Sequence, residues 1–253
     1  MNRVIFDDCI NAIKDIEDAS IDLLITSPPY NVNLGKNKNN NIGYNEHNDN
    51  MAHDEYISWL KKIFCLLKPK MKDDGRLVIN IGDGKNGSIP THYYIINFML
   101  NLNYGMYTTI IWNKNNTSSR TAWGSWKSPS CPSFPTPFEY ILVFYNKSKK
   151  KLTKGETDLK KKDFIDNSLS LWEFPGVKKK HTRHPAAFPL ELPYRCIKQF
   201  TWIGDRVLDI FAGSGTTGQA AKLLNRKYTL IEKDPEYFSI IKDNLNQLTI
   251  NDF

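Results

Sequence analysis

Four consecutive residues near the beginning of the chain, Ser27-Pro28-Pro29-Tyr30, combine a hydroxyl group, two rigid prolines and an aromatic ring. They follow the apolar run Ile21–Thr26, which is typical of a buried strand. The prolines have no backbone N–H and a fixed φ, so we expect carbonyl groups to stay exposed where the strand ends. A hydroxyl, carbonyl acceptors and a ring at one point could hold a flat heterocycle that bears an amino group.

Such an arrangement suits an amine that is a poor nucleophile because its lone pair is delocalised into a ring. We expect Ser27 Oγ and the Pro28 carbonyl to accept the amine hydrogens, which favours the form in which the lone pair is localised. Tyr30 would stack on the ring, and alignment with an electrophilic methyl group would add a contribution from proximity. The sequence thus predicts that Ser27, Pro28, Pro29 and Tyr30 are catalytic. The alternative is a strand exit without a functional role.

A second candidate site is the glycine-rich turn Gly213–Gly218, which follows the apolar run Arg206–Ile210. Glycines let a backbone turn sharply and approach a ligand closely, and an acid at the end of the next strand, Glu232, is placed to bind ribose hydroxyls. Asp209 precedes the turn, and a carboxylate there suits a cationic ligand better than a pyrophosphate. S-adenosyl-L-methionine carries a sulfonium and an ammonium group and no phosphate. The predicted cofactor-binding residues of this region are Asp209, Phe211, Ala212, Gly213, Ser214, Gly215, Thr216, Thr217 and Glu232. The alternative is a tight turn that binds no ligand.

Short apolar runs alternate with helical patterns along the chain, which predicts a mostly parallel sheet covered by helices on both faces. Seven strands are expected, at Arg3–Phe6, Ile21–Thr26, Arg76–Ile81, Tyr107–Trp112, Glu139–Phe144, Arg206–Ile210 and Tyr228–Ile231. Helices are expected near Asp8–Ile16, His53–Leu67, Thr91–Leu100, Thr216–Leu224 and Pro235–Leu248. Four prolines between Pro129 and Pro137 leave no place for a helix before Glu139–Phe144, so this strand and the preceding one are expected to be antiparallel.

The composition fits one globular domain, since 40% of the 253 residues are hydrophobic and 12% are aromatic. No apolar run approaches the roughly 20 residues of a membrane helix, and the first residues lack the pattern of a signal peptide. We therefore expect a cytoplasmic protein with no membrane partner. The four cysteines include no Cys-x-x-Cys pair, which argues against a zinc ribbon or a disulfide framework. The five histidines show no spacing with acids that would predict a metal site.

The excess positive charge is concentrated in the segment 147–183, which carries an excess of seven basic over acidic residues, equal to the net charge of the whole chain. A phosphate-facing surface would need such a charge, and the alternative is a solvated, lysine-rich loop. The predicted DNA-binding residues are Lys149, Lys150, Lys151, Lys160, Lys161, Lys162, Lys178, Lys179 and Lys180. The Asn-rich segment 31–50 shows no periodicity and is expected to be a mobile loop.

In this order along the chain, the Ser-Pro-Pro-Tyr element and the glycine turn resemble the amino-methylating DNA methyltransferases of restriction-modification systems. The arrangement is similar to the circularly permuted beta class, and the resemblance covers nearly the whole chain. It implies a Rossmann-like α/β sheet of seven strands with the last one reversed, S-adenosyl-L-methionine as cofactor, and double-stranded DNA from which one base is flipped. It also implies cofactor contacts from Asp8, Cys9, His184 and Phe188, and it places a target-recognition region at 147–183 in a single methyltransferase domain.

The resemblance also bears on the methylated base. Ser-Pro-Pro-Tyr is typical of the family's cytosine-N4 enzymes and Asp-Pro-Pro-Tyr of its adenine-N6 enzymes, and the segment Trp123–Pro129 also looks like the cytosine-N4 group. We predict methylation of the N4 amine of cytosine, which would protect DNA in a restriction-modification system. Adenine-N6 methylation is the alternative, because a serine could serve either amine. Partners suggested by the resemblance are a second copy of the chain and a cognate restriction endonuclease.

Other classes share parts of this pattern. Glutamine methyltransferases that act on proteins share a Pro-Pro-Tyr tip, but they carry Asn in place of Ser27 and their glycine turn comes first. Cytosine-C5 methylation needs a nucleophilic cysteine, and Cys131 follows a serine where that chemistry would place a proline. RNA as the substrate, and a non-catalytic DNA-binding partner with the same fold, stay open at this point.

Overall fold

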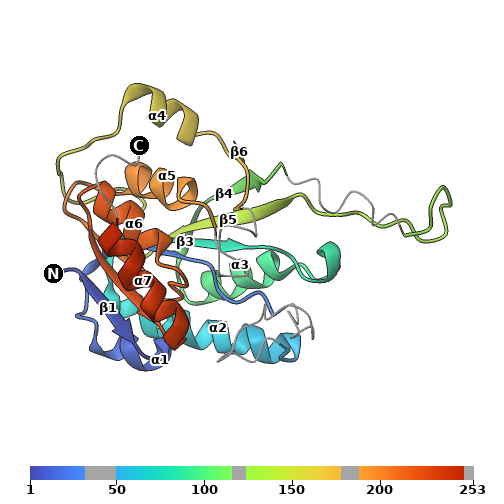
Figure 1. Cartoon of the computed structure of the whole chain (residues 1–253), viewed down its shortest axis with the longest axis horizontal. Coiled ribbons are helices and arrows are strands. Elements are labelled where there is room, and N and C mark those ends of the chain that lie inside the picture. Colours follow the sequence, from blue (N-terminus) through green and yellow to red (C-terminus); the bar gives the residue numbers. More distant parts are fainter. Residues whose placement is uncertain (32–49, 116–123, 178–187, 248–253) are drawn as a thin grey trace.

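The computed structural model of the chain describes residues 1–31, 50–115, 124–177 and 188–247 (Figure 1). One sheet runs through it in the order β1-β8-β7-β2-β3-β5-β4-β6. The strands are β1 Arg3–Phe6, β2 Ile21–Thr26, β3 Met71–Ile81, β4 Gly105–Asn113, β5 Phe138–Tyr145, β6 Leu171–Glu173, β7 Arg206–Asp209 and β8 Lys227–Glu232. The helices are α1 Cys9–Ala12, α2 His53–Leu67, α3 Thr91–Asn101, α4 Lys161–Asn167, α5 Glu191–Phe200, α6 Thr216–Leu223 and α7 Pro235–Gln247.

The strand directions confirm the expected mixed sheet. β1, β8, β7, β2 and β3 are parallel to one another, while β5 is antiparallel to both β3 and β4. The chain enters at the β1 edge and returns there with β7 and β8 at its end, as a permuted order requires. The expected number of seven strands is wrong, because β6 adds an eighth strand parallel to β4. With three residues and only Trp172 buried, β6 is too short for a periodic signal.

Two helices were missing from the sequence prediction. The short α4 lies inside the basic segment, and its only buried residue is Asn167, so it shows no apolar face. α5 was missed because Pro189 and Pro193 suggest a helix break. Pro193 is the third residue of α5, however, and proline is tolerated in the first turn of a helix, where its missing N–H has no partner to lose. The remaining helices begin and end within two residues of their expected bounds, except that α1 is shorter and continues as a 3-10 turn, Ile13–Asp15.

Two hydrophobic clusters cover the two faces of the sheet. Successive side chains of a strand point to opposite faces, and in the fully buried β2 Leu24 belongs to one cluster while Leu23 and Ile25 belong to the other. The first cluster includes buried residues of α2 and α3, and the second includes those of α5, α6 and α7. No described helix is long and apolar enough to span a membrane. The burial of both faces fixes the strand ends rigidly, and loops at those ends can then carry a site.

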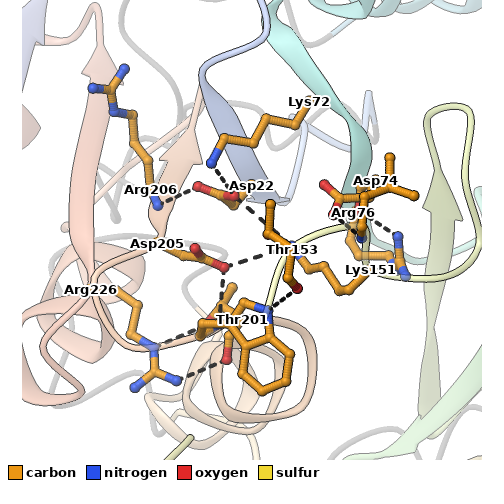
Figure 2. A network of polar contacts seen from close by, with 12 residues as sticks. Asp22, Lys72, Asp74, Arg76, Lys151, Thr153, Thr201, Asp205, Arg206 and Arg226 are labelled. Atoms are coloured by element: carbon orange, nitrogen blue, oxygen red, sulfur yellow. Dashed lines mark hydrogen bonds and ion pairs between the residues drawn. The ribbon is translucent and has the colours of Figure 1, made fainter. Parts of the chain in front are cut away.

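The amino ends of the parallel strands hold a network of charged side chains (Figure 2). Asp22 Oδ1 lies 2.6 Å from Lys72 Nζ, and its Oδ2 accepts the backbone N–H of Arg206 at 2.9 Å. Asp205 Oδ2 lies 3.7 Å from Lys151 Nζ. These contacts join the beginnings of β2, β3 and β7 to the segment that follows β5. We call this border of the sheet the amino edge, and the opposite border the carboxyl edge.

Candidate active site

The Ser-Pro-Pro-Tyr element and the glycine turn meet at the carboxyl edge. β2 and β7 are paired in parallel, with Leu23 opposite Val207 and Leu24 opposite Leu208, so both strands end at the same border of the sheet. Thr26, the last residue of β2, donates a hydrogen bond from Oγ1 to Asp209 Oδ1 at 2.9 Å. The sheet thus brings together two motifs that lie far apart in sequence.

Asp209 connects the two motifs from behind the turn. Its side chain is buried and accepts hydrogen bonds from Thr26 Oγ1, from the Phe211 N–H at 3.1 Å and from Thr217 Oγ1 at 2.6 Å. Burial raises the pKa of the Asp209 carboxyl to about 6, against the lowering effect of these three donors. The carboxylate does not line the adjacent pocket. In this structure it orders the turn, and direct contact with a cofactor stays a prediction.

The glycine turn contains the sharp backbone bends and the close packing that its glycines predict. Gly213 and Gly215 have φ of +52° and +84°, a region that disfavours other residues. A Cβ on Gly218 would lie 2.5 Å from Leu230 Cδ1, so the absence of a side chain lets α6 pack closely on β8. The Gly213 N–H donates to Glu232 Oε2 at 2.7 Å, which fixes the turn against the end of β8.

A pocket opens beside the turn, with an empty volume of about 610 Å³ that includes its mouth. Its lining comes from the ends of β1, β2, β7 and β8 and from α2 and α7. The lining residues are Asp7, Asp8, Cys9, Ser27, Pro29, Trp59, Ile210, Phe211, Ile231, Glu232, Lys233, Asp234 and Tyr237. Four carboxylates therefore face one lysine, and the aromatic rings provide flat apolar surface. This pocket is suited to a cationic ligand with an aromatic part.

Asp8 and Glu232, two predicted cofactor ligands, both line this pocket. Asp8 caps the beginning of α1 and accepts the Ile10 N–H at 2.9 Å, and Glu232 accepts the Asp234 N–H at 2.9 Å. Burial is the main cause that raises the pKa of Glu232. Burial and the neighbouring Asp8 carboxylate raise the pKa of the Cys9 thiol to about 12, so this thiol lines the pocket in its neutral form.

Other predicted cofactor residues are less directly placed. Phe188 is buried in the cluster that covers the α5 face, and Thr217 is occupied by Asp209. Ala212, Ser214, Gly215 and Thr216 belong to the turn or to the beginning of α6 without lining the pocket. His184 lies outside the described residues. Trp59, Lys233, Asp234 and Tyr237 line the pocket but were missed, because single residues on distant helices and loops carry no motif.

The predicted catalytic motif lines the pocket with Ser27 and Pro29, and it is joined to residues that sequence reasoning missed. Ser27 Oγ lies 3.2 Å from Tyr30 Oη and 3.2 Å from the Asn80 carbonyl oxygen. Tyr30 Oη donates to Glu139 Oε2 at 2.9 Å, and Asn80 Nδ2 donates to both Tyr30 Oη and Glu139 Oε2 at 2.8 Å. Lys114 Nζ lies 2.6 Å from Glu139 Oε1. The only sequence signal for Glu139 was an acid at the beginning of a strand after a proline-rich stretch.

Comparison with known proteins places this geometry in a family. A family model described as DNA methylase, N6_N4_Mtase, matches residues 21–243. The chain belongs to this family. It is 44% identical to the type II methyltransferase M.MjaVI of Methanocaldococcus jannaschii over 179 residues, which cover 70% of this chain and 87% of that protein. Hence the chain is a DNA methyltransferase of the N6/N4 family.

Two solved structures show the same fold as this methyltransferase. A DNA modification methylase of Thermus thermophilus, in complex with S-adenosyl-L-methionine, has a TM-score of 0.77 and 27% identity, with 100% of this chain and 96% of that chain covered. The PvuII DNA methyltransferase, described as cytosine-N4-specific, has a TM-score of 0.73 and 20% identity, with 98% and 88% covered. The second likeness bears on the fold alone.

The methyltransferase uses S-adenosyl-L-methionine, and the pocket fits that molecule. A sulfonium and an ammonium group match the four carboxylates of the lining, and Trp59, Phe211 and Tyr237 offer rings for an adenine. Asp8 and Glu232 hold fixed carboxylates that can accept hydrogen bonds from amino and hydroxyl groups. The contacts of these residues with the cofactor stay a prediction.

The lysines of the basic segment lie in several places. Lys149, Lys150 and Lys151 follow β5 at the amino edge, and Lys151 faces Asp22 and Asp205. β5 has eight residues and spans about 25 Å between the two edges, so these three lysines lie at the opposite edge of the sheet from Ser27. Lys160, Lys161 and Lys162 are exposed at the beginning of α4, and Lys178, Lys179 and Lys180 lie outside the described residues, as do positions 32–49 of the Asn-rich loop. Their contacts with DNA stay a prediction.

Proposed function

We propose that this methyltransferase transfers a methyl group to the N4 amine of a cytosine flipped out of duplex DNA. The observation that carries the proposal is the position of Ser27 at the end of β2, where it lines the cofactor pocket and touches Tyr30. A neutral hydroxyl at this point can accept an amine hydrogen while it donates its own hydrogen elsewhere. A type II modification role, in which the mark protects DNA from a cognate endonuclease, agrees with the names of the relatives.

The residues around Ser27 explain how the base amine would be held. Pro28 and Pro29 are buried and rigid, so Ser27 and the carbonyl of Pro28 keep fixed positions relative to the pocket. The hydroxyl of Tyr30 is held by Glu139 and Asn80, which fixes its ring as a stacking surface. S-adenosyl-L-methionine supplies an activated methyl group. Ser27 and Pro28 then favour the localised lone pair of the amine, and no covalent bond between protein and base is needed.

We propose that DNA approaches this site from the carboxyl edge of the sheet. A base that enters the pocket must come from outside that border, and the segment 124–137 extends away from the domain beyond the ends of β4 and β5 (Figure 1). This segment contains no acidic residue, and it exposes Trp126, Lys127 and Phe134. Cations bind phosphates and apolar rings can pack between bases, so we propose the segment as a DNA contact.

Product analysis tests the proposal. The chain is incubated with tritiated S-adenosyl-L-methionine and a mixed-sequence unmethylated duplex, and the DNA is digested to nucleosides that are separated. We expect the label in N4-methylcytosine, and Ser27→Ala should bind the cofactor as the wild type does while losing about 10² to 10³ of the rate. Label in N6-methyladenine would overturn the proposed base but not the family. Full activity of Ser27→Ala would overturn the role of Ser27.

A further inference from the structure

Glu139 is an acidic side chain that touches the Ser-Pro-Pro-Tyr element through Tyr30. It comes from β5, far in sequence from Ser27, and its carboxylate is mostly buried, with 13% of the side chain exposed. The ion pair with Lys114 compensates its charge on the Oε1 side. The other oxygen, Oε2, faces Tyr30 and Asn80. A carboxylate in this position can do more than hold a ring in place.

The direction of each hydrogen bond in this cluster follows from the chemistry of the groups. An ionised carboxylate only accepts, so Tyr30 Oη must donate its hydrogen to Glu139 Oε2. Asn80 Nδ2 only donates, so it occupies one acceptor position of Tyr30 Oη. Tyr30 Oη also lies 3.2 Å from Ser27 Oγ and can accept its hydroxyl hydrogen. The Asn80 carbonyl oxygen is a second acceptor for that hydrogen at 3.2 Å, and when Ser27 points to Tyr30 the hydrogens are aligned from Ser27 through Tyr30 to Glu139.

We propose that Glu139 accepts the proton that the base amine loses during methyl transfer, and that it does so through the hydroxyl groups of Tyr30 and Ser27. This inference rests on the proposed contact between Ser27 and the amine. It applies equally to the N4 amine of cytosine and to the N6 amine of adenine, because both lose one proton when they are methylated.

The step balances in atoms and charge. The amine nitrogen forms a bond to the methyl carbon while the methyl–sulfur bond breaks and its electron pair stays on sulfur. The methylated nitrogen carries one proton too many, and this proton passes to Ser27 Oγ. The Ser27 proton passes to Tyr30 Oη, and the Tyr30 proton passes to Glu139 Oε2. Each hydroxyl is restored, and the only net change in the protein is a protonated Glu139, which later returns its proton to solvent.

The charged and titratable side chains around Glu139 are the other groups that could make the rate depend on pH. Lys114 faces Glu139 from the end of β4, and Tyr30 faces it from the segment after β2. Asp83 and His92 form a separate pair at 2.7 Å, with the His92 ring stacked on Tyr140. Asn80, the third contact from β3, does not titrate. Substitution of Lys114 therefore separates an effect of the ion pair from an effect of the proton acceptor.

The test measures methyl transfer in a single turnover between pH 5 and 9. The enzyme is in excess over the DNA, and the cofactor is in excess over the enzyme. The substrate is the duplex on which the wild type deposits label, whichever base carries it. A proton acceptor works only in its deprotonated form, so we expect the wild-type rate to fall toward acid pH. Glu139→Gln keeps an oxygen that can accept from Tyr30, so it should retain cofactor affinity, lose at least about tenfold in rate at pH 8, and lose the acid fall.

Two further variants keep the test decisive. Tyr30→Phe keeps the stacking ring but interrupts the relay, so it should slow the step as Glu139→Gln does, and the double variant should lose little more. Lys114→Met removes the ion pair while the carboxylate of Glu139 remains, so it should lose less of the rate than Glu139→Gln does. An unchanged rate and pH profile in Glu139→Gln would overturn the relay, as would equal losses in Lys114→Met. Loss of cofactor binding or of label in all variants, including Lys114→Met, would instead count against the proposed site.

Discussion

Carboxylates at the two edges of the sheet are held in two ways: Asp22 and Asp158 at the amino edge by cations, and Asp209 and Glu232 at the carboxyl edge by neutral donors. At the amino edge Asp22 faces Lys72, and Asp158 binds the fully buried guanidinium of Arg226 with both oxygens at 2.8 and 2.9 Å. At the carboxyl edge the hydrogen bonds that hold Asp209 and Glu232 come from hydroxyl and backbone N–H groups.

The partners of a buried carboxylate decide whether it stabilises the fold or acts on a ligand. A carboxylate that is paired with a cation inside the protein stabilises the fold and offers no net charge to a ligand. A carboxylate that is fixed by neutral donors keeps its negative field, at the cost of a raised pKa, and that field can attract a cationic cofactor. Glu232 in the pocket has the second arrangement, because its hydrogen bonds come from backbone N–H groups and burial raises its pKa. We therefore expect charge substitutions to act on stability at the amino edge and on ligand binding and pH response at the carboxyl edge.

The largest effect on stability should come from Arg226→Met. Arg226 also donates to the carbonyl oxygens of Leu224 and Thr201, so its removal leaves buried acceptors and a partly buried Asp158 without partners. We expect a loss of about 3 to 5 kcal/mol in the free energy of unfolding, measured in urea. Arg206→Met is the matched control, because Arg206 faces the exposed Glu17 at 3.8 Å and should lose less than about 1 kcal/mol. Equal losses of unfolding free energy in the two variants would contradict the expectation that the buried ion pair stabilises the fold more than the exposed one.

Asp209→Asn should change the pH dependence of stability. The pKa of Asp209 is raised to about 6, against about 3.8 in the unfolded chain. Between these values the folded protein keeps a proton that the unfolded chain has released, so the wild type loses up to about 3 kcal/mol of stability as pH rises from about 4 to 7. Asparagine does not titrate, and Thr217 can turn its hydroxyl to accept from the new amide. Urea unfolding at several pH values should show the variant gaining relative to the wild type over this window. A constant difference would contradict the raised pKa.

The smallest expected effect concerns DNA binding at the amino edge. Lys149 and Lys150 are exposed there, whereas Lys127 is exposed on the segment 124–137 beyond the carboxyl edge. If DNA is seated at the carboxyl edge, Lys149→Ala/Lys150→Ala should change the dissociation constant for duplex DNA by less than about twofold. Lys127→Ala should reduce the salt dependence of binding by about one counterion. A larger effect of the double variant, measured by salt titration of binding, would support the DNA contact predicted from the charge of the segment.

Local chemistry made much of the fold and part of the site predictable. β1 and β2 have the predicted bounds, and α2 begins and ends at His53 and Leu67 as expected, because each carries a regular apolar pattern. Ser27–Tyr30 and the turn at Gly213 were found because prolines and glycines have backbone requirements that the sequence displays. The direction of β5 also followed from the prolines that precede it.

The sequence by itself determined which chemical groups the protein has and the local geometry of its two motifs. Only the tertiary structure decided what these motifs face. Asp209 is a predicted ligand whose carboxylate is occupied by Thr26 and Thr217, while Glu139 reaches Tyr30 only because β5 runs antiparallel beside β3. A residue's type shows in the sequence, but its partners come from strands paired across long distances along the chain, and those partners set its charge, its burial and its use.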